Sequence, residues 1–291
     1  MKYILLFITS FVFAQQTQFV DFKSVSGQLK LNPKEKVVSG LVDYQFEVLK
    51  PIDTIRIDAK NMEFSEVKID QKKVVFVNTG KELQIINNIQ KGINNLTFEY
   101  SVKPKQALYF VEIEDSDMQI WTQGQGRYTS NWFPSFDDVN EKVIFNLAIT
   151  YDKNHQVISN GILKSKTETN NEFQWQYQME NPMSSYLLML AIGKFDKKEF
   201  KSKSKIPLEY YLEPKDNSRF EPTYRYSKRI FDFLEKETGV KYPWKINRQI
   251  PVRDFLYAGM ENTTTTLFAT RYVVDSIGFV DRNYTNVDAH E

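Results

Sequence analysis

His290 and Glu291, the last two residues of the sequence, carry side chains that could do chemistry together. An imidazole can bind a metal ion, and a carboxylate beside it can take a proton from a bound water. The sequence has no cysteine and one other histidine, His155, which follows a run of polar residues typical of a turn. Any zinc site would therefore need His, Asp and Glu ligands. Because a His-Glu pair also occurs by chance on exposed helices, the preceding sequence has to decide its meaning.

A second candidate is "YAGMENTTTTLF", residues 257–268. Gly259 allows a close approach of the backbone to a bound molecule. Glu261 places a negative charge beside an expected strand edge, where an extended peptide can add as a further strand. The amino group of such a peptide would then lie at the carboxylate. The alternative interpretation is an ordinary edge strand with a solvated glutamate.

A third candidate is "WTQGQGRYTSNWFPSFDD", residues 121–138, which combines aromatic side chains with two glutamines and two adjacent aspartates. Aromatic and amide side chains in one loop can form a binding surface. From the residue types alone, a loop that packs on a sheet is the better interpretation.

The elements that would position these residues are mainly strands between about residues 20 and 200. Apolar residues alternate with polar ones in four clear stretches, which predicts strands with one buried face. The alternating residues are Val42, Tyr44, Phe46 and Val48; Ile55 and Ile57; Val67 and Ile69; and Leu96, Phe98, Tyr100 and Val102. Two further strands are predicted in "VISNGIL" and "SSYLLMLAIGKF". The fold class is therefore mostly β, with antiparallel sheets.

A charged segment, "DKKEFKSKSK" at residues 196–205, marks the predicted end of this first domain. It has no apolar periodicity, which favours a solvated connector or an exposed edge strand. Beyond it, Phe220, Tyr224, Phe231 and Leu234 fall on one helical stripe. This pattern predicts one helix that starts with a capping box of Ser218 and Glu221 and ends at Gly239.

After this helix, residues 245–255 and 258–274 have the β-branched and apolar composition of strands. The last part of the chain is therefore predicted to be α+β, in contrast to the first.

Three motifs in order resemble the M1 family of zinc aminopeptidases. "AGMEN" is similar to the G-x-M-E-N exopeptidase signature of that family, and the final "HE" is similar to the opening of its H-E-x-x-H motif. "TQGQ" followed by "WFPSFDD" resembles a segment of the family's N-terminal domain, in which "VISNG" also recurs. The resemblance runs from about residue 20 to the end of the sequence.

The resemblance implies roles for individual residues. Glu261 matches the residue that binds the free amino group of the substrate, and Gln125 matches a second amine-binding position. His290 matches the first zinc ligand and Glu291 the general base. The neighbouring substrate-binding positions of the same motif are Ala258, Gly259, Met260 and Asn262.

The resemblance also implies the domain organisation. A saddle-like N-terminal β domain would span residues 15–205, and the start of a thermolysin-like catalytic domain would span residues 206–291. The zinc site would be incomplete in this chain, because the second histidine of H-E-x-x-H would lie beyond Glu291. The expected function is the N-terminal part of a zinc aminopeptidase that acts on peptides with a free N-terminus, with this chain alone inactive.

The N-terminus and the charge balance indicate where the protein acts. "MKYILLFITSFVFAQQ" has the form of a signal peptide, with cleavage expected after Ala14, so export to the periplasm, cell surface or medium is predicted. No later stretch is long and apolar enough for a membrane span. The 38 Lys and Arg residues balance 37 Asp and Glu residues, so nucleic acid is not an expected partner.

Two other functions fit parts of the sequence. A secreted, non-catalytic β-rich protein that binds peptide ends would keep the "AGMEN" edge strand without catalysis. A carbohydrate-binding sandwich would explain the aromatic residues but not "AGMEN".

Overall fold

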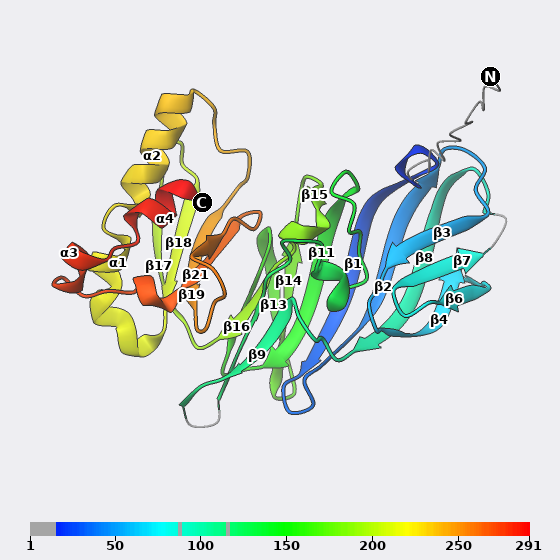
Figure 1. The fold of residues 1–291 in the computed structure, drawn as a ribbon, viewed down its shortest axis with the longest axis horizontal. Coiled ribbons are helices and arrows are strands. Elements are labelled where there is room, and N and C mark those ends of the chain that lie inside the picture. Colours follow the sequence, from blue (N-terminus) through cyan, green and yellow to red (C-terminus); the bar gives the residue numbers. More distant parts are fainter. Residues whose placement is uncertain (1–15, 87–88, 115–116) are drawn as a thin grey trace, which may run out of the picture.

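The computed structural model describes residues 16–86, 89–114 and 117–291, so the predicted signal peptide, residues 1–14, lies outside the described residues. The chain forms two parts that lie side by side (Figure 1). The first part consists of long twisted strands, and the second combines a smaller sheet with helices. This architecture confirms the predicted fold class.

A nine-stranded sheet forms the body of the first part. Its strands run in the order β13-β14-β11-β1-β2-β8-β4-β5, and β15 also pairs with β11. All of these pairs are antiparallel except β1 with β11, which is parallel. The bounds are β1 Val20–Asn32, β2 Val37–Val48, β4 Glu63–Ile69, β5 Lys72–Lys73, β8 Gly92–Val102, β11 Lys142–Asp152, β13 Ile162–Thr169, β14 Glu172–Gln178 and β15 Met183–Ser184.

Two smaller antiparallel sheets complete the first part. One has the order β12-β16-β10-β9 and the other β3-β7-β6. Their bounds are β3 Thr54–Asp58, β6 Phe76–Asn78, β7 Glu82–Ile86, β9 Leu108–Glu112, β10 Met118–Thr122, β12 Gln156–Ser159 and β16 Leu190–Gly193. "VISNGIL" is thus not one strand but the end of β12 and the start of β13. The chain turns between them at Gly161, whose φ of +79° favours glycine.

The core of the first part bears out the alternation in the sequence. Tyr44 and Tyr100 are both buried, and their hydroxyls donate hydrogen bonds to the carbonyl oxygens of Pro134 (2.6 Å) and Trp132 (3.1 Å). Trp132 and Phe133 are fully buried. The second half of the aromatic segment is therefore a loop packed on the sheet, as its residue types favoured.

A five-stranded mixed sheet forms the base of the second part, in the order β17-β18-β19-β21-β20. The bounds are β17 Asp196–Lys201, β18 Pro207–Leu212, β19 Asn247–Val252, β20 Gly259–Met260 and β21 Thr265–Ala269. The charged segment contains the edge strand β17, whose residues are all exposed. The C-terminal sheet therefore begins at Asp196, ahead of the predicted boundary at residue 205.

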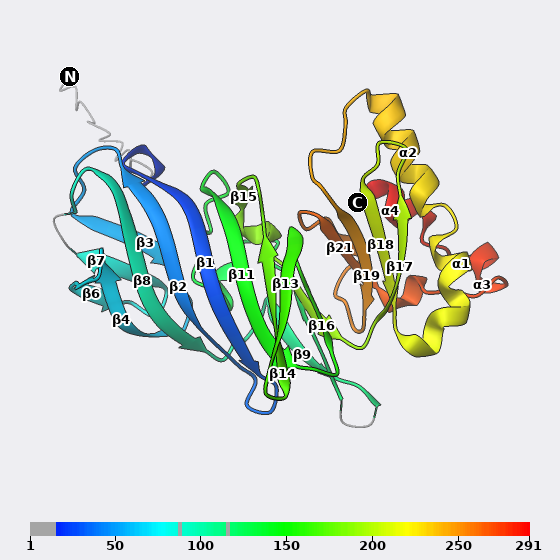
Figure 2. The same cartoon turned by 180° about the vertical axis from the view of Figure 1, so that it is seen from behind.

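The helices cover the face of this sheet that points away from the first part (Figures 1 and 2). They are α1 Phe220–Tyr224, α2 Ser227–Thr238, α3 Gly278–Asp281 and α4 Thr285–His290, and a 3-10 turn at Pro214–Arg219 precedes α1. The sheet thus lies between the helices and the nine-stranded part.

The single helix predicted before Gly239 is wrong in its first half. The helical segment is interrupted between α1 and α2, and neither helix has a side-chain cap. Glu221 does not cap with Ser218, because its carboxylate instead accepts two hydrogen bonds from Arg225, at 2.8 and 2.9 Å. Gly239 ends α2 in the left-handed conformation, as predicted.

One buried acid in the first part gives the fold a pH dependence. The carboxylate of Glu141 accepts a hydrogen bond from the Phe22 amide (3.2 Å), and burial raises its pKa from 4.5 to about 7, with Asp21 and Asp138 adding to the shift. The folded state therefore holds a proton that the unfolded chain releases above pH 4.5. The resulting stabilisation is present below that pH and is lost as the pH rises to about 7.

We expect Glu141→Gln to remove this loss, which amounts to at most on the order of 3 kcal/mol at pH 8. Urea unfolding at pH 5 and pH 8 measures it, with the exposed Glu35→Gln as the control. An equal fall in stability with pH in all three proteins would contradict the assignment.

Candidate functional site

The edge strand β20 positions Glu261. Gly259 and Met260 pair antiparallel with Phe268 and Leu267 of β21, and β20 is the last strand of the sheet, so its outer edge pairs with no other described strand. The Ala258 carbonyl extends this pairing by accepting the Ala269 amide at 3.0 Å. The chain leaves the strand at Glu261, which is exposed.

Two of the predicted substrate-binding side chains do not face solvent. Met260 is 1% exposed and packs in the core between the two parts. Asn262 is 3% exposed, and its amide donates to the Met260 carbonyl (3.3 Å), which stabilises the turn after β20. Met260 therefore offers a peptide only its backbone, while the buried Oδ1 of Asn262 has no hydrogen-bond partner among the described residues.

Gln125 and Glu261 line the same cavity, of about 580 Å³, between the loops of the first part and the C-terminal sheet. Gln125 follows β10, and its backbone N–H donates a hydrogen bond to the side-chain oxygen of Gln123 (3.0 Å). The two predicted amine-binding residues are thus brought together across the junction of the two parts. The other lining residues are Gly126, Arg127, Thr129, Phe136, Asp137, Val139, Asn140, Lys142, Ser184, Ser185 and Tyr186.

No motif in the sequence points to three further residues that line the cavity with Glu261, namely Tyr186, Ser185 and Lys142. Tyr186 and Ser185 come from the turn before β16, and Lys142 comes from the start of β11. No local pattern marks these residues, because only the pairing of β11 with β15 brings them to the cavity.

Glu291 joins Glu261 from the opposite direction. The Glu291 amide continues the last turn of α4 by donating to the Val287 carbonyl at 2.9 Å. Its carboxylate lies so close to Gly259 that a Cβ at this position would overlap with it. The predicted general base and the predicted amine-binding residue therefore meet at the one place in β20 where a side chain would not fit.

The two carboxyl groups influence each other. Burial raises the pKa of Glu291 to about 7, and the negative charge and a hydrogen bond of Glu261 add to the shift. Two adjacent carboxylates repel each other when both are ionised, so they share a proton or attract a cation. An ammonium group has the charge and the donors that such a pair favours.

The described residues do not by themselves fit a zinc site. His290 is exposed at the end of α4, and residues 16–86, 89–114 and 117–291 contain no group of three His, Cys, Asp or Glu side chains that could hold a metal ion. His155 is engaged in the first part, with its ring nitrogens 2.8 and 3.1 Å from the carboxylates of Asp117 and Asp152. We therefore assign no chemical step to a metal.

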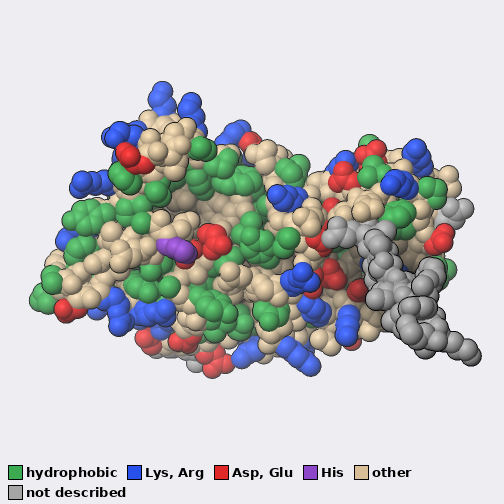
Figure 3. Space-filling model, turned by 45° about the horizontal axis from the view of Figure 1, so that its top comes forward, with side chains coloured by type: hydrophobic (Ala, Val, Ile, Leu, Met, Phe, Trp, Pro, Cys, Tyr) green, Lys and Arg blue, Asp and Glu red, His purple; other side chains and the backbone are tan. Residues whose placement is uncertain are grey.

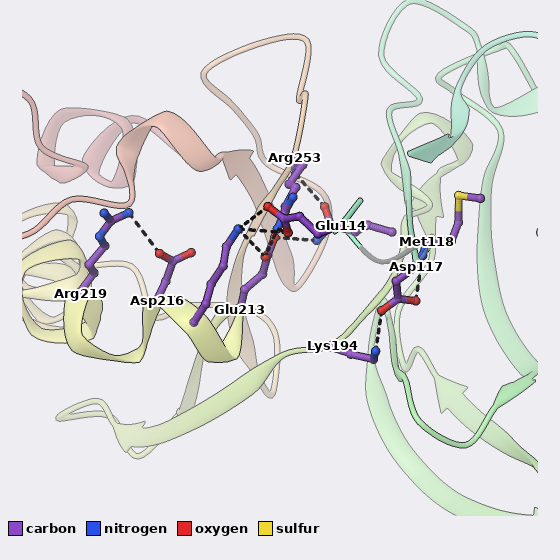
Figure 4. A network of polar contacts seen from close by, with 10 residues as sticks. Glu114, Asp117, Met118, Lys194, Glu213, Asp216, Arg219 and Arg253 are labelled. Atoms are coloured by element: carbon purple, nitrogen blue, oxygen red, sulfur yellow. Dashed lines mark hydrogen bonds and ion pairs between the residues drawn. The ribbon is translucent and has the colours of Figure 1, made fainter. Parts of the chain in front are cut away.

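A polar network joins the two parts (Figure 4). Arg253, which follows β19, pairs with Glu213 (2.6 Å) and with Glu114 of the first part (2.7 Å). The Arg253 amide donates to the Gln119 side chain (2.7 Å), and its carbonyl accepts the Trp121 indole N–H (2.9 Å). Strand β10 and the end of β19 are thus bound through both backbone and side chains.

A buried arginine also joins the two parts. Arg248 of β19 has a side chain that is 3% exposed, and its Nε bonds to Glu209 at 2.7 Å. Its Nη1 donates to the carbonyls of Gly161 (2.7 Å) and Ser159 (3.3 Å) in the turn between β12 and β13. The guanidinium also lies over the ring of Tyr177, 5.6 Å from its centroid. One side chain of the second part therefore satisfies the backbone of a turn in the first.

An apolar surface lies beside Glu291. Leu234 of α2 and Val240 of the following loop are 40% and 67% exposed. A second cavity, of about 380 Å³, lies between this helix, Asp288 and Glu291. Figure 3 shows a hollow rimmed by hydrophobic side chains on the face that also carries a histidine and an acidic group side by side. None of the described helices is long and apolar enough to cross a membrane.

The sequence has relatives among known aminopeptidases. It is 25% identical over 279 residues to the leucyl aminopeptidase of Saccharolobus solfataricus, a match that covers 94% of this chain and 34% of the relative. It is 26% identical over 200 residues to the glutamyl aminopeptidase of Sus scrofa, covering 66% of this chain and 21% of the relative. The chain thus spans at most about a third of the length of these curated relatives.

A protein-family model also matches this chain. Residues 24–187 match the family model described as the peptidase M1 N-terminal domain. The match covers the nine-stranded part and ends in the wall of the cavity, at Leu187. Since it includes more than half of the 291 residues, the chain belongs to the M1 peptidase family.

Proposed function

We propose that this chain supplies the amine-binding part of an exported, zinc-dependent aminopeptidase that removes residues from the free N-terminus of peptides. The observation that carries the proposal is that Glu261 shares a cavity with Gln125 while its carboxylate interacts with that of Glu291 beside Gly259. Export rests on the signal-like sequence of residues 1–14, and zinc on the family resemblance and His290.

The geometry supports a specific division of labour. An extended peptide adds to the outer edge of β20, where backbone groups of Gly259 hold its register. Its ammonium group binds between the Glu261 carboxylate and the Gln125 amide. Because the amine is fixed there, only a peptide that starts at this point is aligned for cleavage, which yields one residue at a time.

Glu291 has the chemistry of a general base. Its pKa of about 7 lies near neutral pH, where a carboxylate both accepts and returns protons readily. Its oxygen Oε2 is buried without a hydrogen-bond partner among the described residues, so it is free to accept one from a substrate or a water.

We further propose that residues outside 1–291 complete the site. The relatives are about three times as long or longer, and the exposed apolar residues of α2 leave a surface that a folded enzyme would cover. The chain of 291 residues alone is therefore expected to be inactive.

Hydrolysis of amino-acid p-nitroanilides tests the proposal. We expect no turnover by purified residues 15–291 with added zinc, and turnover by the product of the whole reading frame that contains them. A chelator should abolish that turnover, and acetylation of the substrate amine should greatly reduce it. Chelator-sensitive turnover by residues 15–291 would show that the metal ligands lie elsewhere in this chain. Peptide binding without turnover by the longer protein would favour the non-catalytic alternative.

A further inference from the structure

We infer that Asn160 is a positioning residue that holds the two walls of the amine-binding cavity in register. It ties the wall that contains Tyr186, in the first part, to the segment that carries Glu261, in the second. The inference rests on the proposed function for its biological meaning, but its geometry stands on the structure alone.

The side chain of Asn160 is buried, and the three hydrogen bonds that it makes all go to backbone groups. Its Nδ2 donates to the carbonyl oxygens of Leu187 (2.9 Å) and Thr263 (2.7 Å), and its Oδ1 accepts the amide of Met189 (2.7 Å). Leu187 directly follows Tyr186 of the cavity wall, and Thr263 lies two residues after Glu261. One amide group therefore fixes the backbone next to both walls.

The neighbouring residue, Gly161, doubles this connection. Its amide donates to the hydroxyl of Thr264 (2.8 Å), and its carbonyl accepts from Arg248 (2.7 Å). The Arg248 amide in turn donates to the Thr264 carbonyl at 2.9 Å. The turn at residues 160–161 is thus bonded to two separate elements of the second part.

Thr264 shows that this connection constrains the segment after Glu261. Its φ is +68°, a strained conformation that a β-branched residue rarely adopts. Such a conformation persists only where the surroundings fix it. Here the surroundings are the bonds of Thr264 to Gly161 and Arg248 and that of Thr263 to Asn160.

Loss of the Asn160 donors would leave two carbonyl oxygens unpaired at the junction, and the strained segment would relax to recover partners. Glu261 would then lose its fixed position opposite Gln125, although neither residue had been changed. Asn160 would act through the backbone of Thr263, without touching a substrate.

The absence of cysteine allows a direct measurement of this register. Nitroxide labels on cysteines introduced at Val139, on the Tyr186 wall, and Tyr257, just before β20, report the distance between the walls by double electron–electron resonance. Both side chains are about half exposed, at 49% and 52%. We expect a single narrow distance in residues 15–291 and a broadened or shifted one in Asn160→Asp, which keeps the shape and the acceptor but loses both donors. Thr264→Val, which removes the acceptor for Gly161, should broaden it as well.

Asn94→Ala is the matched control, because Asn94 is also buried and donates to two carbonyls, those of Gln90 (3.0 Å) and Gly92 (2.8 Å), both within the first part. It should lower the unfolding temperature but leave the distance narrow. A narrow, unshifted distance in Asn160→Asp, or a broad one in the unmodified sequence, would overturn the inference. In the longer protein, Asn160→Asp should raise the KM for free-amine substrates more than it lowers kcat. If that protein proves inactive, the proposed function fails while the distance result still decides the positioning role.

Discussion

Replacement of Arg248 by methionine is expected to lower the free energy of unfolding by about 3–5 kcal/mol, the usual cost of breaking a buried ion pair by removing one partner. Methionine fills most of the volume but leaves the carboxylate of Glu209 and the carbonyl of Gly161 without the guanidinium. Glu209 retains bonds to Lys197 (2.9 Å) and the Tyr211 hydroxyl (2.8 Å), so the lower end of the range is expected if these bonds strengthen.

Lys197→Met is the matched control, since Lys197 pairs with the same carboxylate from an edge strand and is 36% exposed. Its loss should cost less than about 1 kcal/mol, as for other solvent-exposed ion pairs. Urea unfolding followed by circular dichroism and tryptophan fluorescence measures both variants. Equal small losses in the two proteins would show that Arg248 is not the residue that holds the parts together.

The ion pair of Glu209 with Arg248 also predicts how the loss of unfolding free energy in Arg248→Met depends on pH. Burial alone would raise the pKa of Glu209, but Arg248 and Lys197 lower it below its ordinary value. The stabilisation by this carboxylate is therefore present above its usual pKa of 4.5 and is lost as the pH falls through the lower, folded value. The difference between Arg248→Met and the unmodified protein should shrink in strong acid.

The strands of the first part were predictable because their signal is local. Val42, Tyr44, Phe46 and Val48 alternate with polar residues and are all at most 1% exposed. A strand that buries one face has an apolar residue at every second position, which is visible in the sequence. The order of the strands was not predictable, since β1 pairs in parallel with β11 across more than a hundred residues.

The helix before Gly239 shows a different limit. A stripe of apolar residues predicts the helix, but it gives no sign of the interruption at residues 225–226 or of the missing side-chain cap. Glu221 bonds to Arg225 on the next turn instead of capping the helix start, and nothing in the spacing distinguishes these two outcomes.

The site was predictable only in part. Gln125, Glu261 and Glu291 were singled out by family resemblance. In the structure Gln125 and Glu261 line one cavity, and the carboxylate of Glu291 interacts with that of Glu261. The sequence did not predict the role of the turn at residues 160–161, which connects the two parts beside these residues. "VISNG" was noted as a recurring motif, but burial of Asn160 and its bond to Thr263 are tertiary facts without a local signal.

Replacement of Glu261 by alanine in the longer, active protein should reduce kcat/KM for substrates with a free N-terminus by about 30- to 1000-fold. This corresponds to about 2–4 kcal/mol, the usual cost of removing one partner of a charge-assisted contact in a partly enclosed site. Glu291 would keep one negative charge near the amine, because it lies against Gly259 on the same edge of β20. The loss should therefore be large but not complete.

Two comparisons separate amine binding from general damage. Glu261→Gln keeps the shape and an acceptor oxygen but removes the charge, so it should lie close to Glu261→Ala. Glu63→Ala, at an exposed position of β4 in the nine-stranded sheet, should match the unmodified enzyme. The measured quantity is the ratio of kcat/KM for a peptide with a free N-terminus to kcat/KM for the same peptide with an acetylated N-terminus. The preference for the free amine should fall in both Glu261 variants, because the contact that they lose is made only by an ammonium group. If both substrates lost activity equally, the role of Glu261 would be in the fold of the β20 turn, and another group would have to bind the amine.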